Sequence, residues 1–232
     1  MDIIVKMDTP EGDRYKQNVL LILFIPILFF QYSCDKGSES YSIPVLIPGV
    51  TIGSQVWAPF NLDVGMYRNG DVIPKVTDPT AWATLRTGAW CWYNNDSASY
   101  AATYGRLYNW YALNDPRGIA PSGYHLPTDG EWTQLTDYLG GLAIAGGKMK
   151  STTGWTAPNT GATNSSGFSG LPGGYRDGVG SFGNVGNSGY WWSSTENGGA
   201  DAWGRRLDYG QSAVTSGVPN KVYGFSLRCV RD

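Results

Sequence analysis

Apolar residues are concentrated near the start of the chain, in one run from Val19 to Phe30 that contains no charged side chain. The residues before this run carry Lys6, Arg14 and Lys16. A helix that crosses a bilayer needs about 20 apolar residues, so the run is short for a stable span. Its length and its basic flank are typical of the hydrophobic region of a secretory signal.

Cys34 follows the apolar run and is preceded by the small residue Ser33. This pair resembles the lipobox of bacterial lipoproteins, in which the cysteine receives the lipid and becomes the new N-terminus. We therefore predict a lipoprotein signal peptide over residues 1–33, lipidation of Cys34, and a tether over residues 34–49, where the sequence is polar and then interrupted by prolines. An uncleaved N-terminal anchor and a signal peptide cut elsewhere are the alternatives, and Met7 is an alternative start.

Two short β-prone runs separated by Gly53-Ser54 open the sequence that follows the tether. A glycine at the first turn position between such runs predicts a β-hairpin of residues 50–52 and 55–57. Further strand-like runs lie in the C-terminal part and cover residues 190–193, 202–209 and 224–230. In the last run Phe225, Leu227 and Cys229 alternate with other residues, which predicts a half-buried strand.

Two segments have the spacing of a helix. Residues 100–113 place apolar side chains three or four positions apart, which predicts one apolar helical face made by Tyr104, Leu107, Tyr108 and Tyr111. Thr128 and Glu131 form a capping box at the start of a second predicted helix. Its apolar side carries Trp132, Leu135 and Leu139, and Gly140-Gly141 ends it.

Residues 151–189 are dominated by Gly, Ser, Thr, Asn, Pro and aromatic residues, so we predict long loops there. The whole chain has 32 Gly, 10 Trp and 15 Tyr with only 16% charged residues. Many glycines indicate a loop-rich fold, and many large aromatic rings supply the buried area that such a fold needs. Two short helices, short antiparallel strands and long loops predict one α+β domain over residues 50–232.

The charge balance argues against nucleic acid as a partner. The chain has 17 basic and 19 acidic residues and a net charge of −2, so it lacks the basic surface that a nucleic-acid-binding domain requires. The predicted body contains no apolar segment of 20 residues after Cys34, so the membrane is expected to be reached through the N-terminal lipid alone.

Cys91 and Cys229 remain once Cys34 is assigned to the lipid. An even number of cysteines in an exported protein predicts a disulfide, and a bridge between these two would close most of the domain. Two free buried thiols are the alternative.

Catalytic and metal chemistry find little support in the sequence. His125 is the single histidine and lies beside a helix cap, where we predict a packing role. One histidine and dispersed cysteines exclude a Cys-His metal cluster, and no nucleophile elbow or phosphate loop is present. We predict no catalytic residue, no metal ligand and no cofactor, with calcium at Glu196, Asp201 and Asp208 as a less favoured alternative.

Residues 187–220 interleave aromatic rings with polar groups. Binding surfaces have this composition, because the rings supply contact area at low entropic cost. Core strands of the fold are the alternative explanation, and we expect alternate residues to be divided between the two roles. The candidate ligand-binding residues are Tyr190, Asn197, Asp201, Arg205, Arg206, Asp208, Tyr209, Gln211, Asn220 and Tyr223.

A series of segments in fixed order resembles the Fibrobacter succinogenes major paralogous domain, a module of exported bacterial proteins that are often lipoproteins. The resemblance covers residues 50–232 and rests on Ile52-Gly53-Ser54-Gln55-Val56-Trp57, Cys91-Trp92-Tyr93-Asn94-Asn95-Asp96, Gly105-Arg106-Leu107-Tyr108-Asn109-Trp110, Pro121-Ser122-Gly123-Tyr124-His125-Leu126-Pro127-Thr128, Leu171-Pro172-Gly173-Gly174, Trp191-Trp192-Ser193-Ser194 and Arg228-Cys229-Val230-Arg231-Asp232.

That family is distantly similar to the formylglycine-generating, sulfatase-modifying domains, and the likeness implies a C-type-lectin-like fold. The oxidase members carry a catalytic cysteine pair upstream of the C-terminal motif, whereas this chain has no cysteine between Tyr190 and Tyr223. The resemblance therefore implies a non-enzymatic, lipid-anchored module of the cell envelope, at the outer membrane or cell surface. We expect it to bind a protein or carbohydrate ligand through residues 187–220, with a structural or adhesive surface component as the alternative.

Overall fold

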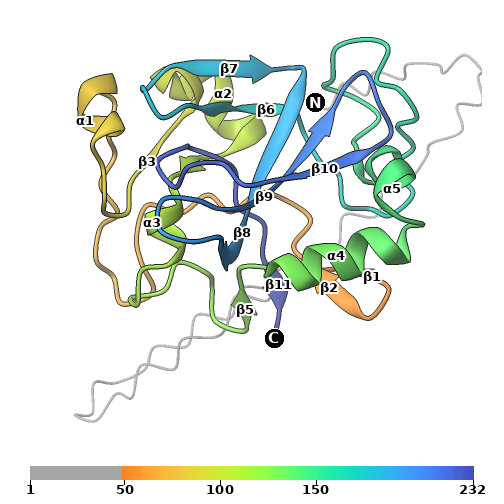
Figure 1. Ribbon diagram of the computed structural model, residues 1–232, viewed down its shortest axis with the longest axis horizontal. Helices are drawn as coiled ribbons and strands as arrows, with labels where there is room; N and C mark the ends of the chain where they lie inside the picture. The colour runs from red at the N-terminus through yellow and green to blue at the C-terminus, as the bar shows by residue number, and fades with distance from the viewer. Residues whose placement is uncertain (1–48) are drawn as a thin grey trace, which may run out of the picture. The chain divides into compact units, whose positions relative to one another are not determined.

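The computed structural model describes residues 49–232 (Figure 1). The predicted signal peptide of residues 1–33, Cys34 and the tether up to residue 48 lie outside the described residues. Helices and antiparallel strands are mixed along the described chain, so the predicted α+β class is confirmed. None of the described helices has the length and apolar character that a bilayer crossing requires.

The first sheet joins the two ends of the described chain. Its strand order is β1-β2-β11-β5, with all neighbours antiparallel, and the strands are β1 (Val50–Ile52), β2 (Gln55–Trp57), β5 (Tyr124–His125) and β11 (Val230–Arg231). The hairpin predicted around Gly53 is confirmed, since Ile52 pairs with Gln55 and Gly53 takes a φ of 63°. This positive φ is the conformation that glycine adopts without steric cost.

A larger sheet forms the C-terminal half and has the order β10-β9-β8-β6-β7. Its strands are β6 (Gly173–Arg176), β7 (Phe182–Val185), β8 (Ser188–Glu196), β9 (Ala202–Asp208) and β10 (Val214–Gly217). The strands predicted at residues 190–193 and 202–209 are confirmed as parts of β8 and β9. Strands β6 and β7 lie inside residues 151–189, for which only loops were predicted.

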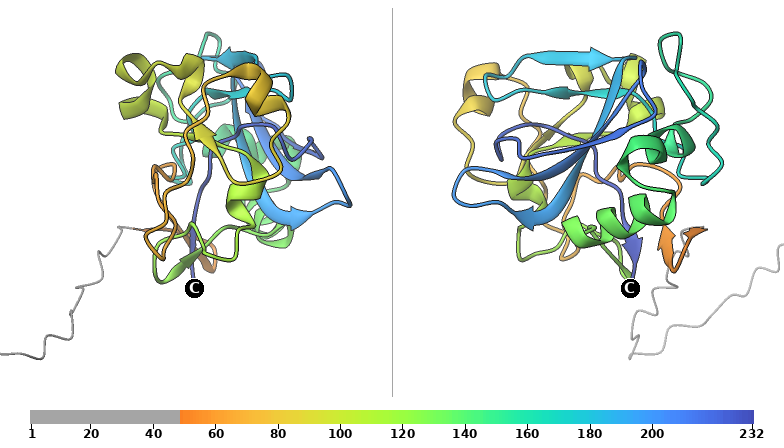
Figure 2. Two further views of the ribbon diagram at one scale, coloured as in Figure 1. Left: turned by 90° about the vertical axis from the view of Figure 1, so that its left-hand side faces the viewer. Right: turned by 45° about the vertical axis from the view of Figure 1, so that its right-hand side comes forward.

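Helix α4 (Asp129–Tyr138) is the predicted capped helix. Thr128 accepts a hydrogen bond from the amide of Glu131, and Glu131 accepts one from the amide of Thr128, so the capping box is confirmed. Helix α4 packs against β8 and β9, and α5 (Leu142–Met149) packs against β10. In both views of Figure 2 these green helices lie beside the blue strands of the larger sheet.

The helix predicted over residues 100–113 is wrong. Helix α2 (Ser97–Tyr104) ends at Gly105, whose φ of 72° breaks the helical path. Strand β4 (Leu107–Tyr108) follows and pairs with β3 (Trp90–Cys91), and α3 (Trp110–Leu113) then begins. The remaining helical turns are α1 (Pro79–Ala83) and η1 (Tyr93–Asn95).

The segment of residues 224–230 runs through the centre of the domain, and every one of its residues is buried. Its backbone bonds to several distant elements: the Leu62 amide donates to the Leu227 carbonyl at 2.8 Å, and the Ala58 amide donates to the Cys229 carbonyl at 2.9 Å. The half-buried strand predicted here is therefore wrong. Both sides of the segment are enclosed by the domain, and only Val230 belongs to a regular strand.

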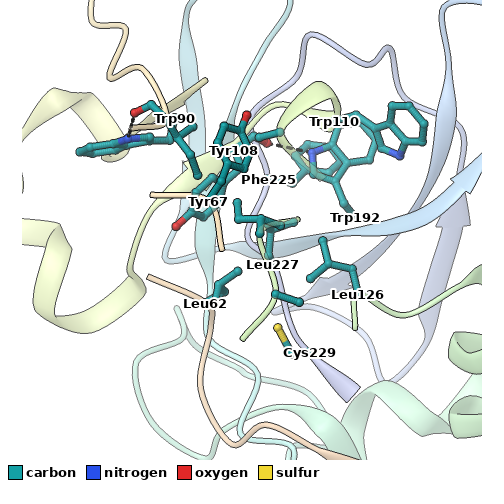
Figure 3. Packing of buried hydrophobic residues seen from close by; sticks show 14 of the residues in the cluster. Leu62, Tyr67, Trp90, Tyr108, Trp110, Leu126, Trp192, Phe225, Leu227 and Cys229 are labelled. Carbon is teal, nitrogen blue, oxygen red and sulfur yellow. Dashed lines mark hydrogen bonds between the residues drawn. The ribbon is translucent and has the colours of Figure 1, made fainter. Parts of the chain in front are cut away.

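Aromatic rings dominate the core. In Figure 3 the rings of Trp192, Phe225 and Tyr108 lie beside the side chain of Leu227. The ring centroids of Trp192 and Phe225 are 4.5 Å apart, and the indole nitrogen of Trp192 donates to the Tyr108 carbonyl at 2.9 Å. Large rings thus supply both apolar contact and hydrogen bonds to strands that are too short to form a core by themselves.

The disulfide predicted between Cys91 and Cys229 is not formed, and both thiols are free and buried. They pack in different hydrophobic clusters: Cys91 lies with Trp82 and Leu107, whereas Cys229 lies in the cluster of Figure 3. Burial raises the pKa of each thiol to about 12, although Arg176 and Arg228 respectively oppose the shift. The alternative of two free buried thiols is the one that the structure bears out.

Four buried cations connect loops to the core. Each lies over an aromatic ring and donates to backbone carbonyl groups, and the four are Lys150, Arg176, Lys221 and Arg228. Lys150 Nζ donates to the carbonyls of Thr160, Asp208 and Gln211 at 2.9, 2.9 and 3.0 Å. A cation that satisfies several carbonyls at once removes the cost of burying loop backbone without partners.

Arg228 and Lys221 show two variants of this arrangement. Arg228 donates to the Ala58 and Phe168 carbonyls at 3.0 and 2.9 Å, and burial lowers its pKa to about 9. Lys221 donates to the Gly199 carbonyl at 2.8 Å and forms an ion pair with Glu196. Long loops are therefore held in place by specific polar contacts rather than by regular secondary structure.

Candidate functional site

A cavity of about 480 Å³ lies against the larger sheet and is lined by residues of β8, β9 and β10. Figure 1 shows where these three strands lie in the domain. Three neighbouring strands supply its base, because Tyr190 pairs with Arg206 and Arg206 pairs with Thr215. Directly paired residues point to the same face of a sheet, so these three side chains stand side by side. The opposite face carries Trp191 and Leu207, which belong to the core around α4.

Aromatic rings form the walls of the cavity. Tyr175 from β6 lies edge-on to Tyr190, with ring centroids 5.0 Å apart, and is stacked on Tyr223 at 6.2 Å and 9°. Phe225 lies behind them, 5.1 Å from the centroid of Tyr190. Asn184 from β7 donates its amide to the Tyr190 hydroxyl at 2.8 Å, which fixes the position of that ring. The walls are therefore preformed, with apolar ring faces and polar edges.

Two paired glycines keep the cavity open. Gly204 on β9 pairs with Gly217 on β10, and both line the cavity. A Cβ on Gly204 would come within 3.5 Å of the Phe225 ring and 3.6 Å of Pro219, whereas a Cβ on Gly217 would have nothing within 4 Å. A side chain at position 217 would consequently project into the empty space that a ligand needs.

The two adjacent arginines of β9 have different environments. Arg205 is buried with 4% of its surface exposed, and its Nη1 forms an ion pair with Asp129 Oδ1 at 2.6 Å. Arg206 points to the cavity face instead, and within residues 49–232 its guanidinium has no hydrogen bond or ion pair, with Nε buried and unpartnered. Asp208, two positions further on the same face, uses its carboxylate for the Ser188 hydroxyl at 3.0 Å. The positive charge of Arg206 is thus available.

The structure brings together only part of the predicted ligand-binding set. Tyr190, Arg205, Arg206 and Tyr223 line the cavity, although the Arg205 side chain serves the ion pair with α4. Six others do not line it: Asn197, Asp201, Asp208, Tyr209, Gln211 and Asn220. Several of these support loops through their backbone, since Asp208 and Gln211 supply carbonyls to Lys150 and the Asn197 amide donates to the Asp201 carbonyl at 3.0 Å.

Sequence reasoning missed eight cavity residues: Tyr175, Asn184, Gly204, Thr215, Gly217, Val218, Pro219 and Phe225. Tyr175 and Asn184 lie in the segment that was predicted to be all loop, and nothing in their local pattern indicates strands. Thr215 and Gly217 lie inside residues 187–220, but the composition of binding surfaces points to aromatic rings and to larger polar or charged side chains, and so it does not indicate these two residues. The period-two alternation of β9 with its partners would have indicated them only if the register had been known.

His125 lies away from this cavity, on β5. Its Nε2 is 2.7 Å from Glu131 Oε1, and its Nδ1 is 2.8 Å from Asp232 Oδ1. Burial lowers the pKa of His125, but the hydrogen bonds with the two carboxylates outweigh it, so the pKa is raised above the usual 6.5. Both ring nitrogens are occupied, and His125 connects β5 to α4 and to the residue after β11.

The acidic residues considered for calcium do not form a site. Among residues 49–232, no three carboxylate, histidine or cysteine side chains gather closely enough to hold a metal ion. Glu196 is paired with Lys221, and Asp208 is bonded to Ser188.

Comparison with known protein families identifies the family of this chain. The sequence model of the family described as the Fibrobacter succinogenes major domain matches residues 50–231. No curated protein and no solved structure matches the chain. Since the match covers most of the chain, the chain belongs to this family.

Proposed function

We propose that this member of the Fibrobacter succinogenes major domain family is a non-enzymatic binding module that takes a protein or carbohydrate ligand into the cavity on β8, β9 and β10. The observation that carries the proposal is a preformed cavity of about 480 Å³ with aromatic walls, two paired glycines at its base and an arginine, Arg206, that has no partner among residues 49–232. Ligand sites are typically concave, mostly apolar and equipped with a few placed polar groups.

The wider setting belongs to the same proposal. The domain has a C-type-lectin-like fold, Cys34 carries a lipid, and the chain is anchored in the cell envelope, at the outer membrane or cell surface. Replacing Cys34 by Ala in the producing bacterium tests the anchor, because recovery of the variant with the membrane fraction at the native level would contradict lipidation. Oxygen consumption with cysteine-containing peptides tests the non-enzymatic assignment, and turnover above a buffer control would contradict it.

Filling the cavity is the direct test of binding. Gly217→Leu places a side chain where a Cβ meets nothing within 4 Å, so the domain should fold normally while the cavity is closed. Gly199→Leu is the matched control, because position 199 is equally open but lies outside the cavity. Both variants and the native full-length chain are applied to an array of glycans and proteins.

Capture that is lost with Gly217→Leu, kept with Gly199→Leu and accompanied by native melting temperatures supports the proposal. Capture that survives Gly217→Leu would place the binding surface elsewhere. Absence of any captured ligand for the native chain would favour the alternative, a structural or adhesive component without a dedicated pocket.

A further inference from the structure

We infer that the ligand of this cavity is an acidic saccharide, a sugar ring that carries a carboxylate; this rests on the proposed function. The charges that line the cavity are the first evidence. Of the residues that the structure describes, Arg205 and Arg206 are the charged ones that line the cavity, and none of the described carboxylates lines it. Because Arg205 is paired with Asp129 on the other face of β9, the free charge is the guanidinium of Arg206.

A guanidinium without a partner indicates an anionic ligand. Arg206 stands between Tyr190 and Thr215, and its Nε is buried without a hydrogen bond among the described residues. Its planar set of donors matches a carboxylate in two parallel hydrogen bonds, which are stronger and more directional than hydrogen bonds between neutral groups. A neutral ligand would leave the buried donor unsatisfied when it excludes water from the cavity.

The walls indicate that the rest of the ligand is a sugar ring. Tyr175, Tyr190 and Tyr223 present ring faces, against which the C–H face of a pyranose can pack. The hydroxyls of Tyr175 and Tyr223 have no hydrogen-bond partner within residues 49–232, and the Thr215 hydroxyl also lies on the lining. A purely hydrocarbon ligand would bury these hydroxyls without partners, whereas sugar hydroxyls both donate to them and accept from them.

Size and rigidity favour a saccharide over an acidic peptide. A cavity of about 480 Å³ encloses one or two sugar rings but only a short piece of an extended chain. An acidic peptide bound by its backbone would add to an exposed strand edge, and the edge strand here is β10. Arg206 lies on β9, which has β8 and β10 as partners, so a peptide paired with β10 would be separated from Arg206 by that strand.

Matched acid and neutral sugars test the inference with the purified full-length chain. Calorimetry is carried out with digalacturonate and with its methyl ester, and then with glucuronic-acid-terminated and glucose-terminated oligosaccharides. We expect each acid to bind at least about tenfold more tightly than its neutral partner. Arg206→Gln should remove this preference, Arg206→Lys should keep part of it, and Arg86→Gln, an exposed arginine outside the cavity, should leave it unchanged.

The outcomes separate this inference from the proposed function. Equal affinity for acid and neutral sugars, an unchanged preference in Arg206→Gln, absence of binding by every acid, or capture of carboxylate-bearing peptides in place of the sugars would each overturn the inference. If ligand capture is lost with Gly217→Leu but not with Arg206→Gln, the cavity binds a ligand of another chemistry and only the inference fails. If Gly217→Leu captures the ligand as well as the native chain does, the proposed function fails as well. Melting temperatures of all variants exclude loss of folding as the cause.

Discussion

Replacing Lys150 by Met tests whether buried cations hold the loops of this domain. Lys150 is fully buried, and its ammonium donates to the carbonyls of Thr160, Asp208 and Gln211 at 2.9, 2.9 and 3.0 Å. Methionine keeps most of the side-chain volume, so the substitution removes the donors while leaving little cavity. The Thr160 carbonyl belongs to one loop, and the Asp208 and Gln211 carbonyls belong to the end of β9 and the turn that follows it, so the ammonium connects these two segments.

The expected loss can be worked out from these contacts. A hydrogen bond to a charged group contributes about 1.5–3 kcal/mol, and removing one partner leaves buried carbonyls unsatisfied at a cost of about 1–3 kcal/mol each. Removal of the buried charge partly offsets this, since burial already lowers the pKa of Lys150, against the opposing effect of Asp208. We therefore expect a net loss of about 3–5 kcal/mol, a large part of the roughly 5–15 kcal/mol that stabilises a typical domain.

Urea unfolding followed by tryptophan fluorescence measures the effect, since the chain has 10 Trp. A loss of this size corresponds to a fall of at least about 6 °C in melting temperature for a domain of this length. Lys148→Met is the matched control, because Lys148 lies two residues earlier in α5 and makes no side-chain hydrogen bond or ion pair within the described region. If the free energies of unfolding of the two variants differ by less than about 1 kcal/mol, the three carbonyl contacts do not stabilise the loops and the reasoning is refuted.

Three other features of the fold can be tested by pH, by backbone fit and by thiol reactivity. Two carboxylate partners raise the pKa of His125 above 6.5, so the free energy of unfolding should fall as pH rises from about 6.5 through the pKa of the folded state. His125→Gln should abolish this pH dependence in urea titrations. An unchanged pH dependence in the variant would show that His125 is not its cause. Gly180→Ala and Gly198→Ala both place Ala at positive φ, which costs about 1–2 kcal/mol of stability. Gly180→Ala should be the more destabilising of the two, because its Cβ would lie 2.5 Å from the Pro79 backbone. Equal decreases in melting temperature would count against close packing at Gly180. Neither Cys91 nor Cys229 should react with a thiol reagent in the native chain, both should react in denaturant, and a band shift on adding reductant would reveal a bridge that the structure lacks.

Elements that depend on neighbouring residues could be predicted from the sequence. Thr128 and Glu131 specify the start of α4 by hydrogen bonds within one turn, and Gly53 specifies the first hairpin by its own φ. Both signals are complete within a few residues, so no tertiary information is needed to interpret them.

Elements that depend on distant partners could not be predicted. The aromatic spacing of residues 100–113 matches a helix, yet Gly105 ends α2 and the following residues are recruited by β3 as a strand. The last segment alternates like a half-buried strand, but the residues that should face solvent include Arg228, which is buried among carbonyls. Charged residues are assigned to the surface by any sequence rule, so buried cations are missed in principle.

The sequence predicted which strands carry the candidate site, but it did not predict most of the residues that line it. Residues 187–220 contain β8, β9 and β10, and alternation correctly divides Arg205 from Arg206 once the register is known. The walls formed by Tyr175 and Asn184 come from β6 and β7, and the parallel pairing of β6 with β8 is a property of the assembled sheet. A pattern along the chain therefore gives the base of the cavity and not its walls.

The central position of residues 224–230 determines when the domain can fold during synthesis. These residues leave the ribosome after everything that they contact, including the Ala58 and Leu62 amides that bond to their carbonyls. Until then the growing polypeptide has no inner segment around which the aromatic rings can close, and it cannot fold progressively from its N-terminal side. Such a nascent chain leaves its apolar rings exposed to solvent for most of its translation.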